Sequence, residues 1–208
     1  MVTNCSTTSA IIHSISQPLA IVDVETTGGR ALRDRVTEIG IILIDEQGVR
    51  EWSTLINPQV RIPPFITQLT GISNDSVAAA PLFADIADEL LELLQGRLFI
   101  AHNARFDYGF VKAEFERIGK RFQTRSLCSV RLSRALNPTQ SRHNLDTVMS
   151  RYGISIDNRH RALDDARVVF EFLIKAEARH GVDTVADAVQ VLNKRPSLPA
   201  YLDESLAD

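Results

Sequence analysis

The sequence has few of the residues that would indicate a disulfide framework, a membrane span or an extended stacking surface. Only two of its 208 residues are cysteines, Cys5 and Cys128, which excludes a disulfide scaffold and a cysteine-rich zinc site. Aromatic residues make up 6% of the chain, which argues against a broad platform for stacking nucleic-acid bases. The longest apolar runs, such as Ile41 to Ile44, are too short for a membrane helix.

Several familiar sequence signals are absent as well. The first 22 residues contain no Asp, Glu, Lys or Arg and are interrupted by Ser, Thr and Asn, unlike the basic start and apolar stretch of a secretory signal. There is no Gly-x-x-x-x-Gly-Lys-Ser/Thr loop for ATP-driven unwinding, and no zinc-finger spacing. Hydrophobic residues (44%) and charged residues (24%) occur in the proportions of a globular domain. We therefore expect a soluble, reduced, cytoplasmic protein without membrane contacts.

The formal net charge of −3 conceals an uneven distribution of charge along the chain. Residues 105–161 contain 12 Lys or Arg and 5 Asp or Glu, whereas the rest of the chain contains 11 basic and 21 acidic residues. A basic segment of this kind is typical of a face that binds a polyanion. Scattered arginines on a solvated helix surface would give the same composition, so charge alone leaves both interpretations open.

The pattern of apolar residues predicts strands first and then helices that alternate with strands. Apolar, β-branched segments at 19–25, 36–45 and 49–56 are expected to form a meander, and short strands are expected at 97–101 and 125–128. Apolar spacings of three and four residues predict helices at 63–71, 82–95, 104–118, 129–136, 144–152, 162–179 and from 182 onward. This order is typical of an α/β domain with a mixed central β-sheet flanked by α-helices.

We divide the chain into an N-terminal extension (1–17), a principal domain (18–181) and a C-terminal segment (182–208). The C-terminal segment begins with a short helix, continues through Lys194-Arg195-Pro196-Ser197-Leu198-Pro199 and ends in acidic residues. Such a composition is typical of an appendage or linker and not of a core element.

Two carboxylates within the first apolar strand are the strongest functional signal. Asp23 and Glu25 are two residues apart, so on a strand both side chains point to the same face. Like charges in apolar surroundings are costly unless a cation lies between them, and oxygen ligands suit Mg²⁺ or Mn²⁺. The alternative is that both residues lie at an exposed strand end, beside the loop that begins at Thr26.

Two later segments place acidic residues at the starts of helices. Residues 102–107 (HNARFD) lie where a strand passes into a helix, which is where α/β sheets gather functional residues. Asp107 of this segment could also serve only to interact with the helix N-terminus. Residues 160–166 (HRALDDA) open the longest predicted helix, and two alanines four residues apart would let that helix approach the sheet closely. Asp165 could then reach the carboxylates of the first strand.

These three segments resemble the three exonuclease motifs of the DEDDh exonucleases. The matching residues, in the family's order and spacing, are Asp23-x-Glu25, Asn103-x-x-Phe106-Asp107 and His160-x-Ala162-x-x-Asp165. The DEDDh enzymes are the DnaQ-like branch of the ribonuclease H-like fold, which includes the epsilon proofreading subunit of bacterial DNA polymerase III. Smaller features agree, among them Thr37-Glu38-Ile39-Gly40 and Leu69-Thr70-Gly71-Ile72. The resemblance predicts a ribonuclease H-like fold and a DEDDh exonuclease domain at 18–181.

The resemblance implies a metal-dependent 3′-5′ exonuclease that releases nucleoside 5′-monophosphates. Two Mg²⁺ or Mn²⁺ ions, about 3.5 to 4 Å apart in enzymes of this kind, would be held by Asp23, Glu25, Asp107 and Asp165. His160 would act as general base for the attacking water, since its reference pKa of about 6.5 is close to working pH. The substrate-binding residues would be Thr26, Thr27, Leu69, Thr70, Asn103 and Phe106.

Two residues beside the motifs could be mistaken for members of the site. Asp164 adjoins Asp165, but the spacing from His160 favours Asp165 as the ligand. We expect Asp164 to be solvated or paired with an arginine. His102 is expected to cap or pack at the strand end, because His160 already fills the role of the base.

We expect the substrate to be the 3′ end of single-stranded DNA, in proofreading or repair. An RNA-trimming enzyme like ribonuclease T or oligoribonuclease is the alternative, because the pocket around the 2′ position is not visible in the sequence. A noncatalytic polymerase-associated subunit is a further alternative, but a scaffold does not need four converging carboxylates. Residues 194–199 are similar to the connector before a GIY-YIG endonuclease domain in some bacterial repair nucleases. This similarity suggests a stand-alone relative or a partner of that class of repair nuclease, and a simple polar terminus is the other interpretation. The resemblance to the epsilon proofreading subunit implies a DNA polymerase as a further candidate partner.

Overall fold

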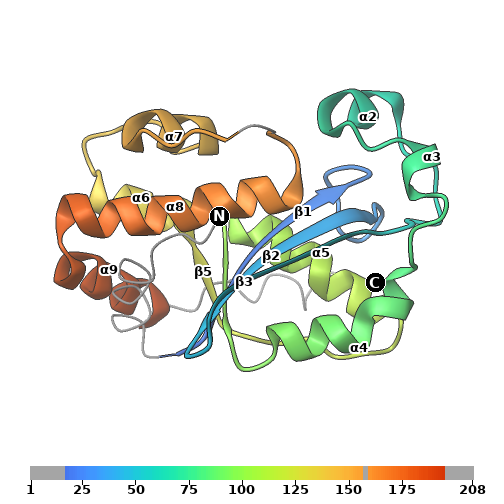
Figure 1. The fold of residues 1–208 in the computed structure, drawn as a ribbon, viewed down its shortest axis with the longest axis horizontal. Coiled ribbons are helices and arrows are strands. Elements are labelled where there is room, and N and C mark those ends of the chain that lie inside the picture. The colour runs from blue at the N-terminus through green and yellow to red at the C-terminus, as the bar shows by residue number, and fades with distance from the viewer. Residues whose placement is uncertain (1–16, 157–158, 195–208) are drawn as a thin grey trace, which may run out of the picture.

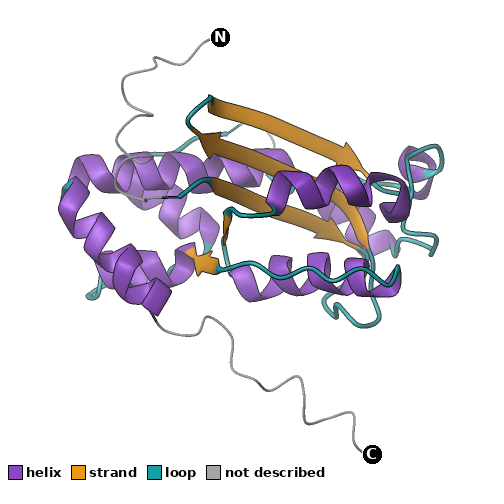
Figure 2. Cartoon of the chain, turned by 90° about the horizontal axis from the view of Figure 1, so that it is seen from below, coloured by secondary structure: helices purple, strands orange, loops and turns teal. Residues whose placement is uncertain are grey.

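The computed structural model describes residues 17–156 and 159–194, which form a five-stranded sheet with helices on both faces (Figures 1 and 2). The strands are β1 (Leu19–Thr26), β2 (Val36–Asp45), β3 (Gly48–Leu55), β4 (Leu98–Ala101) and β5 (Ser126–Cys128). The helices are α2 (Pro64–Thr70), α3 (Asn74–Val77), α4 (Phe83–Leu94), α5 (Ala104–Arg117), α6 (Ser129–Leu136), α7 (Leu145–Tyr152), α8 (Ala162–His180) and α9 (Val182–Lys194).

The sheet is mixed and has the strand order β3-β2-β1-β4-β5. β2 pairs antiparallel with β1 and β3, whereas β4 runs parallel to β1 and β5 runs parallel to β4. The carboxyl ends of β1, β4 and β5 therefore lie at one end of the sheet, and the turn between β2 and β3 lies at the opposite end. The predicted α/β domain with a mixed central sheet is confirmed.

Each face of the sheet carries its own apolar core, because neighbouring strand residues point to opposite sides. On one face Ala20 and Val22 of β1 pack with α4 and α5, whose buried aromatic residues include Phe83 and Phe110. On the other face Leu19 and Ile21 of β1 belong to a core formed with α6, α7, α8 and α9. Burial of one such large side chain contributes about 1.5 to 3 kcal/mol relative to exposure. Along β1 only Asp23 and Glu25 are partly exposed.

The start of α8 lies against β2 with no room for a side chain between them. A Cβ atom added to Gly40 would lie 2.2 Å from the backbone nitrogen of Leu163. Ala162 and Ala166 of α8 are fully buried, and the helix crosses the face of the sheet (Figure 1). The close approach that the two alanines predict is confirmed, and a glycine on the facing strand completes it.

The helix α9 is part of the core, so the interpretation as an appendage is wrong for residues 182–194. Val185 and Val189 are buried in the same apolar core as Phe172 of α8. A stripe of two valines in a 13-residue helix is a weak pattern, and only the surface offered by α6 and α8 makes it a core element. Residues 1–16 of the predicted extension and residues 195–208 of the predicted tail lie outside the described residues.

Candidate active site

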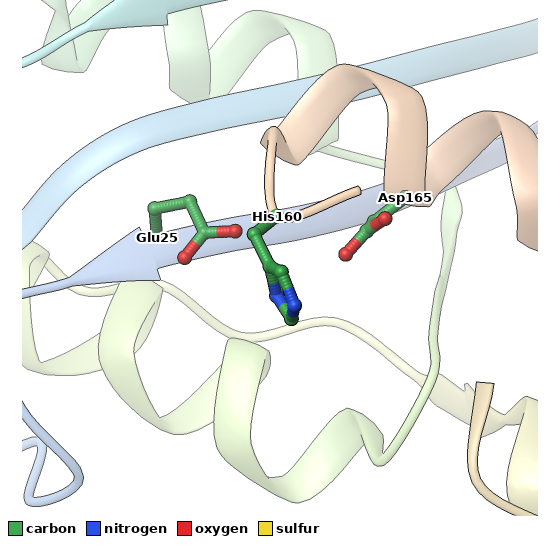
Figure 3. Close-up of side chains that lie close together, drawn as sticks. All are labelled: Glu25, His160 and Asp165. Atoms are coloured by element: carbon green, nitrogen blue, oxygen red, sulfur yellow. The ribbon is translucent and has the colours of Figure 1, made fainter. Parts of the chain in front are cut away.

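The carboxyl end of β1 gathers acidic side chains and a histidine from separate elements. Figure 3 shows Glu25 of β1 together with His160, which precedes α8, and Asp165 in the first turn of α8. A carboxylate oxygen of Glu25, a carboxylate oxygen of Asp165 and a ring nitrogen of His160 all lie within 4.8 Å of one another. The geometry therefore brings the first and third motifs together as the sequence predicts.

The second motif reaches the same place through the helix α5. Asp107 lies in the first turn of α5 and is 2% exposed. Its Oδ1 accepts a hydrogen bond of 3.2 Å from the backbone N–H of Val24, the residue between Asp23 and Glu25. This bond fixes the start of α5 against the point of β1 where the two carboxylates lie.

The four carboxylates oppose one another's ionisation. Burial, followed by the charges of Asp107, Asp165 and Glu25, raises the pKa of Asp23 well above its ordinary value. Burial and the charge of Asp165 raise the pKa of Glu25 to about 7. The pKa values of Asp107 and Asp165 are also raised, chiefly by burial. A divalent cation would offset this opposition, and an all-oxygen donor set fits Mg²⁺ or Mn²⁺, so these residues form a possible acidic metal-binding cluster.

Arg159 supplies a positive charge at the rim of the cluster. Its guanidinium donates to Asp165 and, over 2.9 Å, to Asp146 of α7. The charge of Arg159 lowers the pKa of Asp165 and of Glu25, against the larger effect of burial. Nothing in the spacing of the motifs marks this residue, and sequence analysis did not find it.

Glu38 of β2 holds the start of α8 in position. It is buried, and its carboxylate accepts hydrogen bonds from the Arg161 side chain (2.6 Å from Nη2) and from the backbone N–H of Ala162 (3.0 Å). Because His160 directly precedes Arg161, this anchor also limits where the histidine can lie. The role of Glu38 was not predicted, although a carboxylate inside an apolar strand is the same signal that marks Asp23.

Both loops that deliver these residues contain a left-handed backbone conformation at a residue that is not glycine. Asn103, immediately before α5, has φ of 70°, and His160 has φ of 63°. Such conformations are uncommon outside glycine and cost energy, but Asn and His adopt them more often than most residues. They turn the chain sharply into the two helices whose first turns carry Asp107 and Asp165.

The two threonines after the motif on β1 use their side chains to shape the following loop. Thr26 Oγ1 donates to the carbonyl of Gly28 over 2.6 Å, and Thr27 Oγ1 accepts from the N–H of Arg35 over 2.9 Å. Both residues are buried, and Thr27 also lines a cavity of about 540 Å³. Their predicted contact with the terminal nucleotide stays a prediction.

The remaining predicted substrate residues differ in exposure. Leu69 of α2 is 53% exposed, whereas Thr70 is buried and its hydroxyl donates to the carbonyl of Ile66 over 3.0 Å. Phe106 is partly buried and its ring centroid lies 4.8 Å from that of Phe110. The substrate roles of Leu69, Thr70, Phe106 and Asn103 stay predictions.

The two residues beside the motifs lie as expected. Asp164 accepts a hydrogen bond of 2.5 Å from Nη1 of Arg167, which confirms an arginine-paired role. His102 packs at the end of β4, with its Nδ1 2.9 Å from Oγ of Ser129. Burial lowers the pKa of His102 to about 4, so its ring is uncharged near pH 7.

Comparison with known proteins places this chain in a family. Residues 20–173 match the family model described as an exonuclease, that of ribonuclease T. The chain belongs to the DnaQ-like exonucleases. This DnaQ-like chain is 32% identical over 196 residues to the PolC-type DNA polymerase III of Caldanaerobacter subterraneus, covering 90% of the chain and 14% of that polymerase. It is 33% identical to the DNA polymerase III subunit epsilon of Treponema pallidum, covering 76% of the chain and 75% of that subunit.

The solved structures confirm the fold of this DnaQ-like chain. E. coli Exonuclease I in complex with a dA16 oligonucleotide has a TM-score of 0.72 and 19% identity, covering 82% of this chain and 42% of that one. The ribonuclease H-like fold predicted for the chain is therefore confirmed. The chain spans less than a fifth of the length of the PolC-type relatives that it matches. Within residues 17–156 and 159–194, no helix is long and apolar enough to cross a membrane.

Proposed function

We propose that this protein is a metal-dependent 3′-5′ exonuclease that removes nucleoside 5′-monophosphates from the 3′ end of single-stranded DNA. The observation that carries the proposal is the convergence of acidic residues from β1, α5 and α8, together with His160, on the carboxyl end of β1. Structural ion pairs bring opposite charges together, whereas this cluster, apart from the pair of Arg159 with Asp165, brings like charges together. Such an arrangement is typical of a site that binds cations.

Asp23, Glu25, Asp107 and Asp165 would hold two Mg²⁺ or Mn²⁺ ions in this proposal. Divalent ions bound among carboxylates polarise phosphodiester oxygens and make water a stronger nucleophile at neutral pH. Two of the four side chains are buried and two are partly buried, which suits this role. A carboxylate that is less hydrated gains more from a nearby cation.

His160 would take the proton of the attacking water. As the water oxygen bonds to phosphorus, the bond from phosphorus to the 3′ oxygen of the preceding nucleotide breaks, and that oxygen gains a proton from solvent. The products are a nucleoside 5′-monophosphate and a strand shorter by one nucleotide. The ion pair of Glu38 with Arg161 supports the role of His160, because it restrains the backbone on which the imidazole is carried.

The surroundings of the site favour a single strand over a duplex as the substrate. The cavity beside Thr27 is also lined by Phe65, whose side chain is 65% exposed on α2. Leu69, on the same helix, is exposed as well. Exposed apolar and aromatic side chains stack on unpaired bases with little preference for sequence. We therefore keep Thr26, Thr27, Leu69, Thr70, Asn103 and Phe106 as proposed contacts of the terminal nucleotides.

We place this activity in replication or repair in the cytoplasm, with a DNA polymerase or a repair nuclease as partner. Two relatives support this placement by their names, the PolC-type DNA polymerase III and the DNA polymerase III subunit epsilon. The N-terminal extension (1–17) and the exonuclease domain from residue 18 stay part of the proposal, whereas α9 of the segment 182–208 packs into the core of that domain.

The test is degradation of 5′-labelled single-stranded DNA and RNA of the same sequence, with Mg²⁺, with Mn²⁺ and with EDTA. The wild-type chain should shorten the labelled DNA one nucleotide at a time from its 3′ end only when metal is present. Asp165→Asn and His160→Ala should lose this activity, and Asp164→Asn is the matched control that should keep it, because Asp164 pairs with Arg167.

Each other outcome has a definite meaning. Faster degradation of RNA would replace DNA by RNA as the substrate class. Absence of cleavage of both strands by folded protein with metal would overturn the enzymatic proposal and favour a noncatalytic polymerase-associated subunit.

A further inference from the structure

A second concave site lies beside the loop of the second motif. It is a cavity of about 270 Å³ between the starts of α5 and α6. Asn103 and Ala104 form one wall, and Cys128, at the end of β5, forms part of another. Three arginines complete the lining, so we call this site the arginine cavity: Arg105, Arg131 and Arg134.

The topology of the sheet creates this cavity. β4 and β5 are parallel neighbours, and the helices that follow them turn to opposite faces of the sheet. Phe110 of α5 belongs to one apolar core, and Leu132 of α6 belongs to the other. A crevice opens where successive helices diverge in this way, beyond the carboxyl ends of the strands, and ligands of α/β sheets bind there. The arginine cavity therefore lies at the same end of the sheet as the carboxylates of β1.

None of the three arginines has an acidic partner among residues 17–156 and 159–194, and all three line the same cavity. Some other cations of the basic segment 105–161 are paired, for example Arg117 with Glu114 and Lys120 with Asp88, whereas others, such as Arg121, also have no acidic partner among the described residues. Arg131 and Arg134 are three residues apart on α6, so their guanidiniums repel each other along one helix face. An anion between them would remove this repulsion.

We propose that the arginine cavity binds the backbone phosphates of the strand on the 5′ side of the nucleotide being removed. This inference rests on the proposed function, because it takes the substrate strand as the ligand. Guanidinium groups bind phosphate oxygens through paired hydrogen bonds, and among the described residues no aromatic side chain lines the cavity to stack on a base. The arginine cavity therefore recognises the phosphate backbone of the strand, independently of its base sequence. Arg105 lies two residues before Asp107, so the cavity and the acidic cluster are joined by the same turn of α5.

The first experiment measures binding in EDTA, where the strand is not cleaved. A fluorescent twelve-nucleotide oligothymidylate is titrated with protein at several salt concentrations. Exchange of Arg105, Arg131 and Arg134 for Gln should weaken binding at least tenfold at low salt. The slope of log K against log salt should fall by about 0.7 for each phosphate that the variant no longer neutralises. Arg50→Gln is the control, because Arg50 is exposed and pairs with Asp45 at the opposite end of the sheet.

A second readout leaves all three arginines in place. In a Cys5→Ser chain Cys128 is the remaining thiol, and it lines the cavity. The oligonucleotide should slow alkylation of Cys128 several-fold. Inorganic phosphate and a mononucleotide at the same concentration should slow it little, because the ligand is a continuous strand. Protection by inorganic phosphate alone would identify a free anion as the ligand and overturn the assignment to the strand.

The two proposals fail in different ways. If the wild-type chain degrades DNA but the triple variant keeps its affinity and salt slope, and Cys128 is not protected, the arginine cavity does not bind the strand. If the chain binds and protects Cys128 but does not cleave with metal, the cavity stands and the exonuclease proposal fails. If the triple variant has a lower melting temperature than the wild-type chain, its binding data would be discarded. Protection of Cys128 from alkylation would then decide whether the cavity binds the strand.

Discussion

Aspartates at the two ends of the sheet have opposite electrostatic surroundings. Asp45, at the turn between β2 and β3, accepts hydrogen bonds from Arg50 (2.7 Å) and Arg97 (2.6 Å). Although burial acts in the other direction, these two guanidiniums lower the pKa of Asp45 below its ordinary value. At the carboxyl end of β1, burial and three neighbouring carboxylates raise the pKa of Asp23.

The carboxylate of Asp45 stabilises the fold, whereas the carboxylates at the end of β1 have surroundings that, in the proposed function, suit a ligand. At the turn, each charge has its partner within the protein, so the ionised carboxylate stabilises the folded state. At the end of β1 the folded state is destabilised by carboxylates that face one another, and it also contains the two left-handed residues Asn103 and His160. Such costs persist where an external ligand offsets them, and in the proposed function that ligand is a cation.

The largest effect is expected when an aspartate is replaced by asparagine, once at each end of the sheet. Asp23→Asn should lower exonuclease activity by about a thousandfold or more, since it removes a proposed metal ligand. In EDTA it should also raise the melting temperature, because one of four opposing charges is gone. Asp45→Asn should leave activity unchanged and lower stability by about 1.5 to 3 kcal/mol, the typical contribution of hydrogen bonds to a charged group. Activity assays and thermal unfolding in EDTA check both; a less stable Asp23→Asn protein would contradict the comparison.

The next effect concerns the packing of α8 on β2. Gly40→Ala places a Cβ atom 2.2 Å from the nitrogen of Leu163, so the start of α8 must move. We expect a loss of about 3 kcal/mol and about a hundredfold in activity, because His160 and Asp165 move with the helix. Gly29→Ala, where no heavy atom of the described residues lies within 4 Å of the added Cβ, is the control for stability, and its free energy of unfolding should be nearly unchanged. Equal stability of the Gly40→Ala and Gly29→Ala proteins would show that the close contact between β2 and the start of α8 is not needed.

The third prediction concerns pH. Because the pKa of Glu25 is raised from 4.5 to about 7 in the folded protein, the folded state binds more protons than the unfolded state between these values. Without metal, the contribution of Glu25 to the free energy of unfolding should therefore be most favourable below about pH 4.5. This contribution should fall on the order of 2 kcal/mol as pH rises through 7. Urea unfolding in EDTA at several pH values measures this fall. Glu25→Gln should flatten the profile, and Mg²⁺ should reduce the fall; an unchanged profile in Glu25→Gln would rule out this residue as the source.

The smallest effect distinguishes two ion pairs that both hold α8. Glu38→Gln weakens the buried anchor of Arg161 and Ala162, and we expect about a tenfold loss in kcat with little change in KM. Glu51→Gln removes the exposed pair of β3 with Arg167 and should cost only about 0.2 to 1 kcal/mol of stability, with activity retained. Steady-state kinetics of both variants test this order, and a larger loss in Glu51→Gln would reverse it.

Most of the fold could be predicted because local patterns and tertiary packing agree. The helix predicted at 144–152 is an example: the side chain of Asn144 accepts from the N–H of Thr147 at its start, and Gly153 ends it with φ of 61°. The helix α9 is the counterexample. Its two buried valines become core residues only because α6 and α8 provide a surface, which no local pattern contains.

The amino-acid pattern was enough to identify the residues that could form the site, because carboxylates inside an apolar strand and at two helix starts are costly without a shared partner. It also determined most helix and strand bounds, since these follow from apolar spacing and end signals. Three features are visible only in the folded chain: Glu38 anchors α8, Arg159 contacts Asp165, and three arginines line one cavity. These contacts join residues far apart in the chain or depend on how loops turn, and the parallel pairing of β1, β4 and β5 brings them to one end of the sheet.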